Sequence, residues 1–204
     1  MSSARPREVP PRWRGELDER LALVEPGDTI RGLFINGLLE GVRALGDEAL
    51  VRRCVEEAGG EEPFLDFFMY PLGMDLRLTY TAVSLLAERT GKSLEEAFEL
   101  LGRRATADFL GSVMGRTLRL LAGGNPRRML SGLPTAYSVS VSFGERKVVW
   151  TGPRSARFSM RREFLPTSFH EGTLRAVLES VNVWGRVQGR QLSLLDAEYE
   201  ISWE

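Results

Sequence analysis

The hydrophobic spacing of this 204-residue chain changes once, within the stretch Gly123 to Arg154, and this change constrains the fold more than any other feature. Before the stretch, apolar residues recur every three or four positions, as in amphipathic helices. After Tyr137, apolar and polar residues alternate in the two-residue period of strands. The sequence therefore predicts a helical half over about residues 13–135 and a sheet half over about residues 136–204. The wall of any cavity between them would lie in this stretch.

The composition is that of a globular protein with one domain. Hydrophobic residues make up 43% of the chain and charged residues 27%, which is ordinary for a globular protein. Residues 1–12 contain three prolines and little to bury, so we expect a flexible tail there and a single domain over residues 13–204. The 27 basic and 28 acidic side chains give a net charge of -1. This balance offers no electrostatic basis for binding nucleic acid.

The sequence predicts neither export nor a membrane span. Its first residues lack the apolar segment of a signal peptide, and no run approaches the roughly 20 apolar residues that a membrane span requires. The only cysteine, Cys54, lies on the apolar stripe of a predicted helix, where cysteine acts as a small hydrophobic residue. One cysteine also excludes an intramolecular disulfide. We therefore expect a cytoplasmic protein.

Capping residues mark where the helices of the first half should begin. Serine, aspartate and asparagine side chains accept hydrogen bonds from the free amides of a first helical turn. The expected caps are Asp28, Asp47, Ser93 with Glu96 as a capping box, and Asn125 followed by Pro126. We expect the last of these helices to end near Gly132. The apolar stripe over residues 94–121 is interrupted near Gly111, so one bent helix and two separate helices remain alternatives.

Two glycines, Gly37 and Gly41, lie one turn apart within a predicted helix. Glycine costs about 1 kcal/mol in a helix interior relative to alanine, so the pair predicts the close approach of another backbone. If the chain is a dimeric scaffold, we expect that backbone to belong to the second copy.

The clearest strand pattern is SVSVSF, from Ser138 to Phe143. We expect it to turn at Gly144-Glu145 and to pair with a second strand over Lys147–Trp150. Ala156–Met160 is either a third strand or an extension of the second. These segments predict a first hairpin in the sheet half.

A helix and a second hairpin should follow. Ser168 and Glu171 form a capping-box pattern, and residues 184–192 and 197–203 alternate as a pair of strands. The predicted fold class is α+β, in which an N-terminal helical bundle packs on an antiparallel sheet of about four strands. The order of elements in the sheet half is hairpin, helix, hairpin.

The sequence contains no recognisable catalytic or metal-binding motif. His170 is the only histidine, which excludes metal sites that need two, and a Ser-His-Asp triad would have to use it. It falls in the first turn of a predicted helix, near the buried stripe. We expect a hydrogen-bonded histidine at the seam between helices and sheet, with a catalytic base or a haem ligand as alternatives. No nucleophile, base and paired acid can be placed together, so we expect a protein that is not an enzyme.

Several segments resemble a large paralogous family of uncharacterised myxobacterial proteins. The segments are GLFINGLLEGVRALG, LAGGNPRRMLSGLPTAYSVSVSFGERKVVWTGPRSA, FHEG and the terminal DAEYEISWE. The resemblance covers almost the whole chain beyond the N-terminal tail. It implies membership of that family and no particular activity.

The order of elements is also similar to haem nitric-oxide/oxygen-binding (H-NOX) domains and to their 4-vinyl-reductase and Bet3-type relatives. In H-NOX domains a histidine that ligates haem iron follows a Leu-Pro segment. In this chain the segment is Leu133-Pro134-Thr135-Ala136-Tyr137, so Tyr137 stands in the place of the histidine. The H-NOX motif Tyr-x-Ser-x-Arg, which holds the haem propionates, keeps only Arg154. The resemblance therefore implies an H-NOX-like scaffold with a cavity, without the usual haem site.

Two functions remain close alternatives at this level. The first is a non-enzymatic regulatory module that binds a small hydrophobic molecule between helices and sheet, with no cofactor required. The second is a homodimeric protein-interaction scaffold without a ligand. A haem-binding sensor that uses Tyr137 or His170 is a third. The residues expected to line the ligand site are Phe67, Phe68, Tyr70, Tyr80, Tyr137, Trp150 and Arg154.

Overall fold

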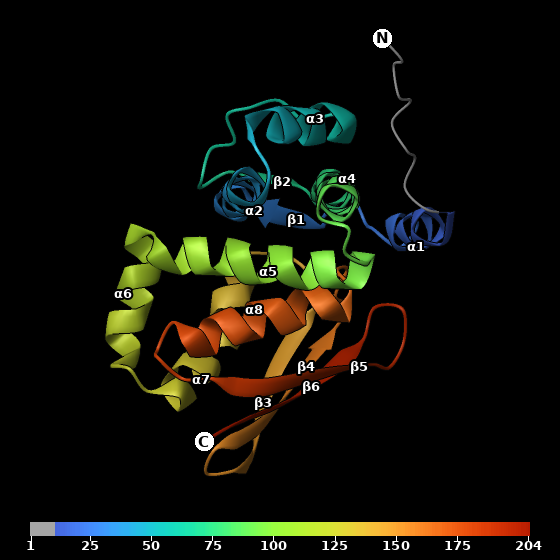
Figure 1. Ribbon diagram of the computed structural model, residues 1–204. Coiled ribbons are helices and arrows are strands. Elements are labelled where there is room, and N and C mark those ends of the chain that lie inside the picture. Colours follow the sequence, from blue (N-terminus) through green and yellow to red (C-terminus); the bar gives the residue numbers. More distant parts are fainter. Residues whose placement is uncertain (1–10) are drawn as a thin grey trace.

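The computed structural model describes residues 11–204 (Figure 1). The first ten residues of the expected tail lie outside the described part, and the first helix begins at Pro11. The helices are α1 (Pro11–Leu21), α2 (Gly32–Leu45), α3 (Glu48–Ala58), α4 (Leu72–Thr90), α5 (Leu94–Gly111), α6 (Val113–Ala122), α7 (Pro126–Ser138) and α8 (Thr167–Glu179). The strands are β1 (Thr29–Arg31), β2 (Met69–Pro71), β3 (Glu145–Gly152), β4 (Ser155–Arg161), β5 (Gly185–Gln191) and β6 (Ala197–Trp203).

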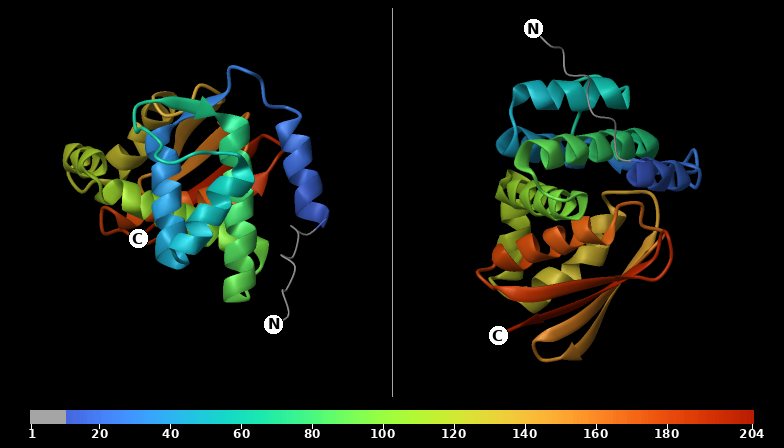
Figure 2. Two further views of the ribbon diagram at one scale, coloured as in Figure 1. Left: turned by 90° about the horizontal axis from the view of Figure 1, so that it is seen from above. Right: turned by 45° about the vertical axis from the view of Figure 1, so that its right-hand side comes forward.

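The elements stack in layers, as the sequence predicts for an α+β fold. Helices α2, α3 and α4 lie at one end, α5 and α8 form the middle, and the larger sheet closes the other end (Figures 1 and 2). That sheet is antiparallel, in the order β3-β4-β6-β5. The short strands β1 and β2 pair with each other within the helical half. In the described part of the chain, no helix is long and apolar enough to cross a membrane.

Most of the predicted helix caps are present. The Asp47 side chain accepts a hydrogen bond from the Leu50 amide, Ser93 and Glu96 form the capping box, and the Asn125 side chain accepts from the amides of α7. Residues 94–121 form two helices, because Ser112 ends α5 in an extended conformation and caps α6.

Two predicted caps are wrong. Asp28 caps no helix: β1 follows it, and its buried carboxylate accepts hydrogen bonds from Arg162 and from the Glu25 amide. Glu171 does not close a capping box with Ser168, because α8 starts after Pro166 without a side-chain cap. The Glu171 carboxylate instead accepts a hydrogen bond from the Gly189 amide of β5. Both acids bind a distant segment, which local spacing does not reveal.

The prediction of a strand over Ser138–Phe143 is also wrong. Helix α7 extends beyond Gly132 to Ser138, and the first strand of the sheet is β3. The Ser138 and Ser140 hydroxyls donate back to carbonyl groups of α7, which is a local bond that competes with strand pairing. The first hairpin is therefore β3–β4, with its turn at residues 152–155. The second hairpin, β5–β6, is confirmed.

Glycines let the middle layer pack backbone to backbone. A Cβ atom on Gly172 of α8 would lie 2.0 Å from the Glu99 carbonyl oxygen of α5, and one on Gly102 would lie 2.1 Å from that of Phe169. Gly37 and Gly41 of α2 face Ala105 of α5 less closely. A Cβ atom on Gly41 would lie 3.3 Å from the Ala105 amide nitrogen, and one on Gly37 would lie 3.7 Å from the Ala105 carbonyl oxygen. The close helix contact predicted from these two glycines therefore lies within the chain and is not reserved for a second copy.

Candidate functional site

The two halves meet at a short segment that precedes β3, residues 139–144, which we call the junction segment. Its residues pair with β1 of the helical half. The Arg31 amide donates to the Ser140 carbonyl at 2.9 Å, and the Ser142 amide donates to the Thr29 carbonyl at 3.1 Å. The Ser142 hydroxyl also accepts from the Thr29 amide at 2.8 Å and donates to the Gly27 carbonyl at 2.7 Å. The junction segment thus lies along β1 and extends the small β1–β2 sheet on that side.

A cleft of about 560 Å³ opens against this segment. Its walls are the end of α7, the junction segment and the start of β3. The lining residues are Pro134, Ser138, Val141, Ser142, Phe143, Gly144, Glu145, Arg146 and Lys147. Apolar and polar groups contribute to the lining, as is common in sites for small molecules.

A group of buried polar side chains lies behind the cleft. We call Arg146, Glu163, His170 and Tyr137 the buried cluster. Arg146 of β3 forms an ion pair with Glu163, which precedes α8. The Nε2 atom of His170 lies 3.3 Å from Glu163 Oε1, and its Nδ1 atom is 3.2 Å from the Tyr137 hydroxyl. The cluster joins α7, β3 and α8 through one chain of contacts.

The electrostatics of the buried cluster favour an ionised Glu163. Burial opposes ionisation, but the charges of His170 and Arg146 and their hydrogen bonds hold the pKa of Glu163 well below its usual range. The amides of Phe164 and Leu165 also donate to this carboxylate, at 3.0 and 3.3 Å. Burial, together with the nearby negative charge of Glu163, raises the pKa of Tyr137 above its usual value. The Tyr137 hydroxyl therefore stays protonated.

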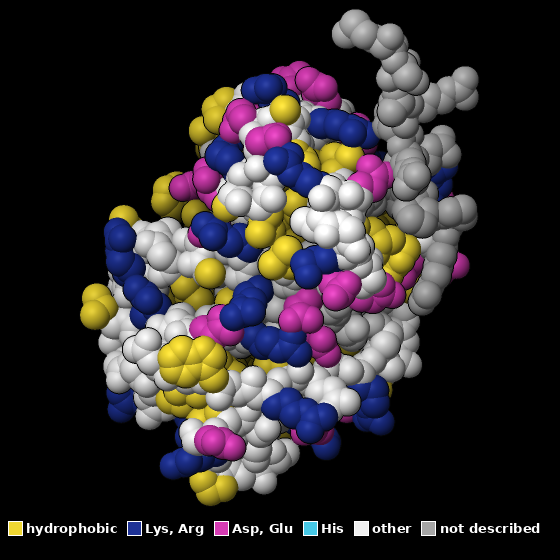
Figure 3. Space-filling view, viewed as in Figure 1, with side chains coloured by type: hydrophobic (Ala, Val, Ile, Leu, Met, Phe, Trp, Pro, Cys, Tyr) yellow, Lys and Arg dark blue, Asp and Glu magenta, His cyan; other side chains and the backbone are white. Residues whose placement is uncertain are grey.

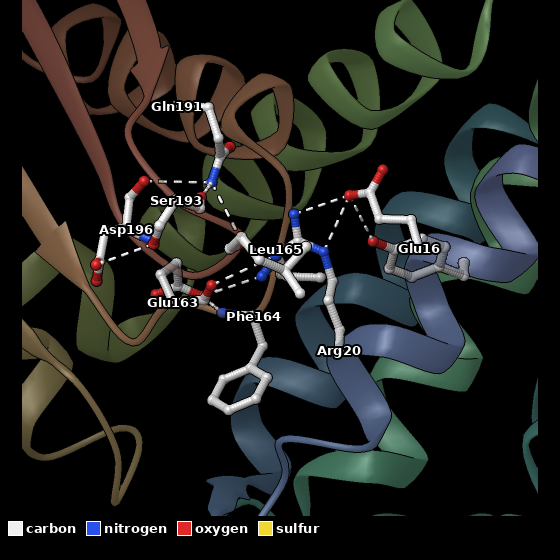
Figure 4. A network of polar contacts seen from close by, with 10 residues as sticks. Glu16, Arg20, Glu163, Phe164, Leu165, Gln191, Ser193 and Asp196 are labelled. Carbon is white, nitrogen blue, oxygen red and sulfur yellow. Dashed lines mark hydrogen bonds and ion pairs between the residues drawn. The ribbon is translucent and has the colours of Figure 1, made fainter.

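The helical half reaches the same place through α1 and α4. Figure 4 shows Arg20 of α1 between Glu16 and the backbone of Glu163. Arg20 donates to the Glu16 carboxylate at 2.8 Å and to the Glu163 carbonyl at 3.5 Å. Asp75 of α4 is only 4% exposed. Burial, and then the negative charge of Glu163, raise the pKa of Asp75 to about 7.

Of the residues expected to line the ligand site, Tyr137 alone joins the buried cluster. Phe67 and Phe68 are 73% and 61% exposed, on the loop before β2, and do not line an internal cavity. The Tyr70 hydroxyl accepts a hydrogen bond from the Leu65 amide at 2.8 Å and so fixes this loop. Tyr80 is buried in the helical half, where it packs against Trp13 and Phe98.

The two expected residues on the first hairpin are likewise elsewhere. Arg154 is exposed in the β3–β4 turn. Trp150 packs under the guanidinium of Arg127, whose Cζ atom is 3.9 Å from the ring centroid. The structure therefore does not bring the seven expected residues into one pocket. Between the halves, Leu72 and Leu76 of α4 pack in one apolar cluster with Phe143 and Phe164. His170, expected as a hydrogen-bonded histidine at the seam between helices and sheet, is confirmed in that place.

Arg146 and Glu163 were missed by the sequence reasoning. Arg146 shares the inward phase of β3 with Val148 and Trp150, and an arginine at an inward strand position is a signal of a buried partner. That signal requires the correct strand. The predicted hairpin started too early and left Arg146 outside the strand, between the turn at Gly144-Glu145 and the strand over Lys147–Trp150.

The described residues do not fit a haem. The two side chains considered as iron ligands, Tyr137 and His170, are bonded to each other. The Tyr137 ring lies between Arg146, whose Cζ atom is 4.9 Å from the ring centroid, and Phe158. Behind them, α5 and α8 are in backbone contact at Gly102 and Gly172. Ligation of iron would require this arrangement to open.

Solved structures of H-NOX proteins resemble this chain in fold. A mutant H-NOX protein from K. algicida, in the Fe(II) unliganded state, is 15% identical with a TM-score of 0.65, and the match covers 86% of this chain and 97% of that one. An H-NOX protein from S. oneidensis in the Fe(II)NO state is 11% identical with a TM-score of 0.67, covering 86% and 99%. An oxygen-binding H-NOX domain related to soluble guanylate cyclases, in its oxygen complex, is 12% identical with a TM-score of 0.66, covering 86% and 95%.

The comparison with curated proteins gave no match. The model of one family, described as a protein of unknown function (DUF2378), matches residues 23–204. This match spans both halves, the junction segment and the buried cluster. The chain therefore belongs to the DUF2378 family and has the fold of H-NOX domains.

Proposed function

We propose that this chain is a non-enzymatic regulatory module that acts in the cytoplasm and binds a small, partly apolar molecule in the cleft beside the junction segment. One observation carries the proposal: Arg146 belongs both to the lining of the cleft and to the buried cluster. A molecule that enters the cleft would meet a residue whose ion pair ties β3 to the segment before α8. A molecule bound in the cleft could therefore alter the ion pair between Arg146 and Glu163 in the buried cluster.

The lining supports a ligand with an apolar body and a polar group. Pro134, Val141 and Phe143 offer apolar surface, while Ser138 and Lys147 offer donors. Two of the solved H-NOX structures named above hold oxygen or nitric oxide, so proteins of this fold accommodate small molecules. In this chain the cleft replaces the internal cavity as the place for the ligand.

The buried cluster supports a role other than catalysis. A tyrosine acting as nucleophile or base needs a lowered pKa, whereas burial raises the pKa of Tyr137. Glu163 is held as an ion by Arg146 and accepts backbone hydrogen bonds, so its lone pairs are engaged. We infer that these residues hold a conformation and transfer no proton to a substrate.

Native mass spectrometry tests the proposal. The protein purified without added ligand should carry an extra non-covalent mass that is not haem. Ser138→Trp, which fills the cleft from α7, should lose that mass. Ser131→Trp is the matched control, because Ser131 is exposed on the same helix and is not part of the cleft lining; it should keep the mass. A wild-type protein that stays bare, or a mass that survives Ser138→Trp, would contradict the proposed site.

A homodimeric interaction module is the second candidate, and helix α6 favours it. Val113, Leu120 and Leu121 are 74%, 80% and 73% exposed, and apolar side chains lie at the edge of the molecule that α6 forms (Figure 3). Exposed apolar side chains on one helix are typical of an interface between copies. The same native spectrum gives the oligomeric state: a dimer lost in Leu120→Glu supports this candidate, and a wild-type monomer removes it.

A further inference from the structure

We propose that the junction segment transmits occupancy of the cleft to β1 of the helical half. This inference rests on the proposed function, since it describes how that cleft would regulate. The juxtaposition that carries it is that residues 141–144 line the cleft and are bonded to both halves at once. Because the junction segment is hydrogen-bonded on both sides, moving it relative to one half strains its hydrogen bonds to the other.

On the helical side, the contacts are concentrated on three residues of the segment. Ser140 accepts from the Arg31 amide, Val141 bridges to Ile30, and the Ser142 hydroxyl bonds both the Thr29 amide and the Gly27 carbonyl. Thr29–Arg31 pairs in turn with β2, which leads directly into α4. Movement of the segment would therefore reach the N-terminal end of α4.

On the sheet side, Phe143 and Gly144 are fixed. The Phe143 carbonyl accepts from Arg146, and its ring packs edge-on against Phe164 with centroids 5.3 Å apart. Gly144 has a φ of +69°, and a Cβ atom there would lie 2.6 Å from the Arg161 carbonyl oxygen. This end of the segment is thus held by the residue that also binds Glu163.

A tether beside the segment strengthens the link between the halves. Arg162, which follows β4, forms a two-pronged ion pair with Asp28 at 2.6 and 2.8 Å. Asp28 precedes β1 directly, and its carbonyl accepts from the Leu72 amide of α4. The residues that receive the junction segment are therefore tied to the sheet half by a second route.

NMR-detected hydrogen exchange on the full chain tests the coupling without knowledge of the ligand. Ser138→Trp serves as a permanent occupant of the cleft. We expect exchange of the Thr29 and Arg31 amides to rise at least fivefold relative to Ser131→Trp, because the indole displaces the acceptors on Ser142 and Ser140. Amides of α3, which lies away from the cleft, should be unchanged. Rates for Thr29 and Arg31 within twofold of the Ser131→Trp control would overturn the inference.

Ser142→Ala provides a second variant, since Ser142 is exposed and the change is small. Loss of its hydroxyl should speed exchange at Thr29 and also at Phe164, whose amide donates to Glu163 on the far side of the cleft. An effect confined to Thr29 would show a local bond only and overturn the coupling. Because exchange is measured without ligand, the two ideas separate. If native mass spectrometry finds a bound molecule but the variants leave hydrogen exchange unchanged, the coupling is wrong and the proposed function stands. If exchange changes on both sides of the cleft but the protein carries no bound molecule, the proposed function is wrong and the coupling stands.

Discussion

Two buried carboxyl groups, Asp75 and Glu163, have pKa values displaced in opposite directions. Glu163 has Arg146 and His170 as neighbours, and backbone amides that stabilise its charge. Among the described residues, Asp75 has no such partner: burial raises its pKa to about 7, and the negative charge of Glu163 adds to the effect. Burial alone therefore does not set the charge of a side chain, and the neighbours decide it.

The raised pKa of Asp75 predicts a specific pH dependence of stability. The folded state holds this proton more tightly than the unfolded chain, so the contribution is full below pH 3.8 and is lost as the pH rises through about 7. With Asn at this position the contribution disappears. As the pH rises from 5 to 8, we expect the wild type to lose about 2–3 kcal/mol of unfolding free energy that Asp75→Asn does not lose. Urea denaturation of both proteins across this pH range measures the difference.

A matched control for this measurement is Asp18→Asn, on the exposed side of α1. Its unfolding free energy should follow that of the wild type within about 0.5 kcal/mol at every pH. Parallel curves for Asp75→Asn and wild type from pH 5 to 8 would show that Asp75 is not held neutral by burial.

At the scale of elements, the contact between α5 and α8 depends on glycine. Gly102 and Gly172 allow each helix to approach a carbonyl oxygen of the other, at a distance that leaves no room for a Cβ atom. Helices in ordinary contact are 8–10 Å apart, and small residues permit a closer approach. This contact holds the middle layer against which both the helical half and the sheet pack.

We expect Gly172→Ala to destabilise the protein by about 2–3 kcal/mol, because the added methyl group meets backbone atoms of α5 and not a flexible side chain. Gly111→Ala is the control. It lies in the last turn of α5 with nothing near its Cβ position, so the change should be neutral or stabilise by up to about 1 kcal/mol. Urea denaturation of both variants decides the matter, and equal stability would show that α5 and α8 are not in close contact.

The segment SVSVSF shows why alternation alone did not identify a strand. Its serines at positions 138 and 140 donate hydrogen bonds to the last turn of α7, and only Val141 forms a bridge, to Ile30 of β1. An extended segment and a strand share the same two-residue period, and the pairing partner is distant in sequence. Strands β5 and β6 were predicted correctly as a hairpin, because the two strands are neighbours in the chain. For Ala156–Met160, the alternative of a separate third strand is the one observed, as part of β4.

At the scale of the whole molecule, the order of helices and hairpins predicted the fold class and the resemblance to H-NOX domains. The site was less predictable. Tyr137 and His170 were both noted, but their contact joins residues 33 positions apart. Glu163 carried no local pattern, and the inward position of Arg146 is visible only once β3 is placed correctly. Buried ion pairs are set by tertiary packing, which periodicity does not encode.

The buried cluster joins Tyr137, His170, Glu163 and Arg146 through one chain of contacts within the sheet half. Since His170 is the only histidine of the chain, one set of imidazole resonances reports on that cluster. We would record them by NMR in protein labelled with ¹⁵N-histidine, for wild type, Tyr137→Phe, Glu163→Gln and the control Tyr70→Phe. We expect Tyr137→Phe to shift the Nδ1 signal and Glu163→Gln to shift the Nε2 signal, while Tyr70→Phe shifts neither. Identical spectra for all four proteins would contradict the buried cluster.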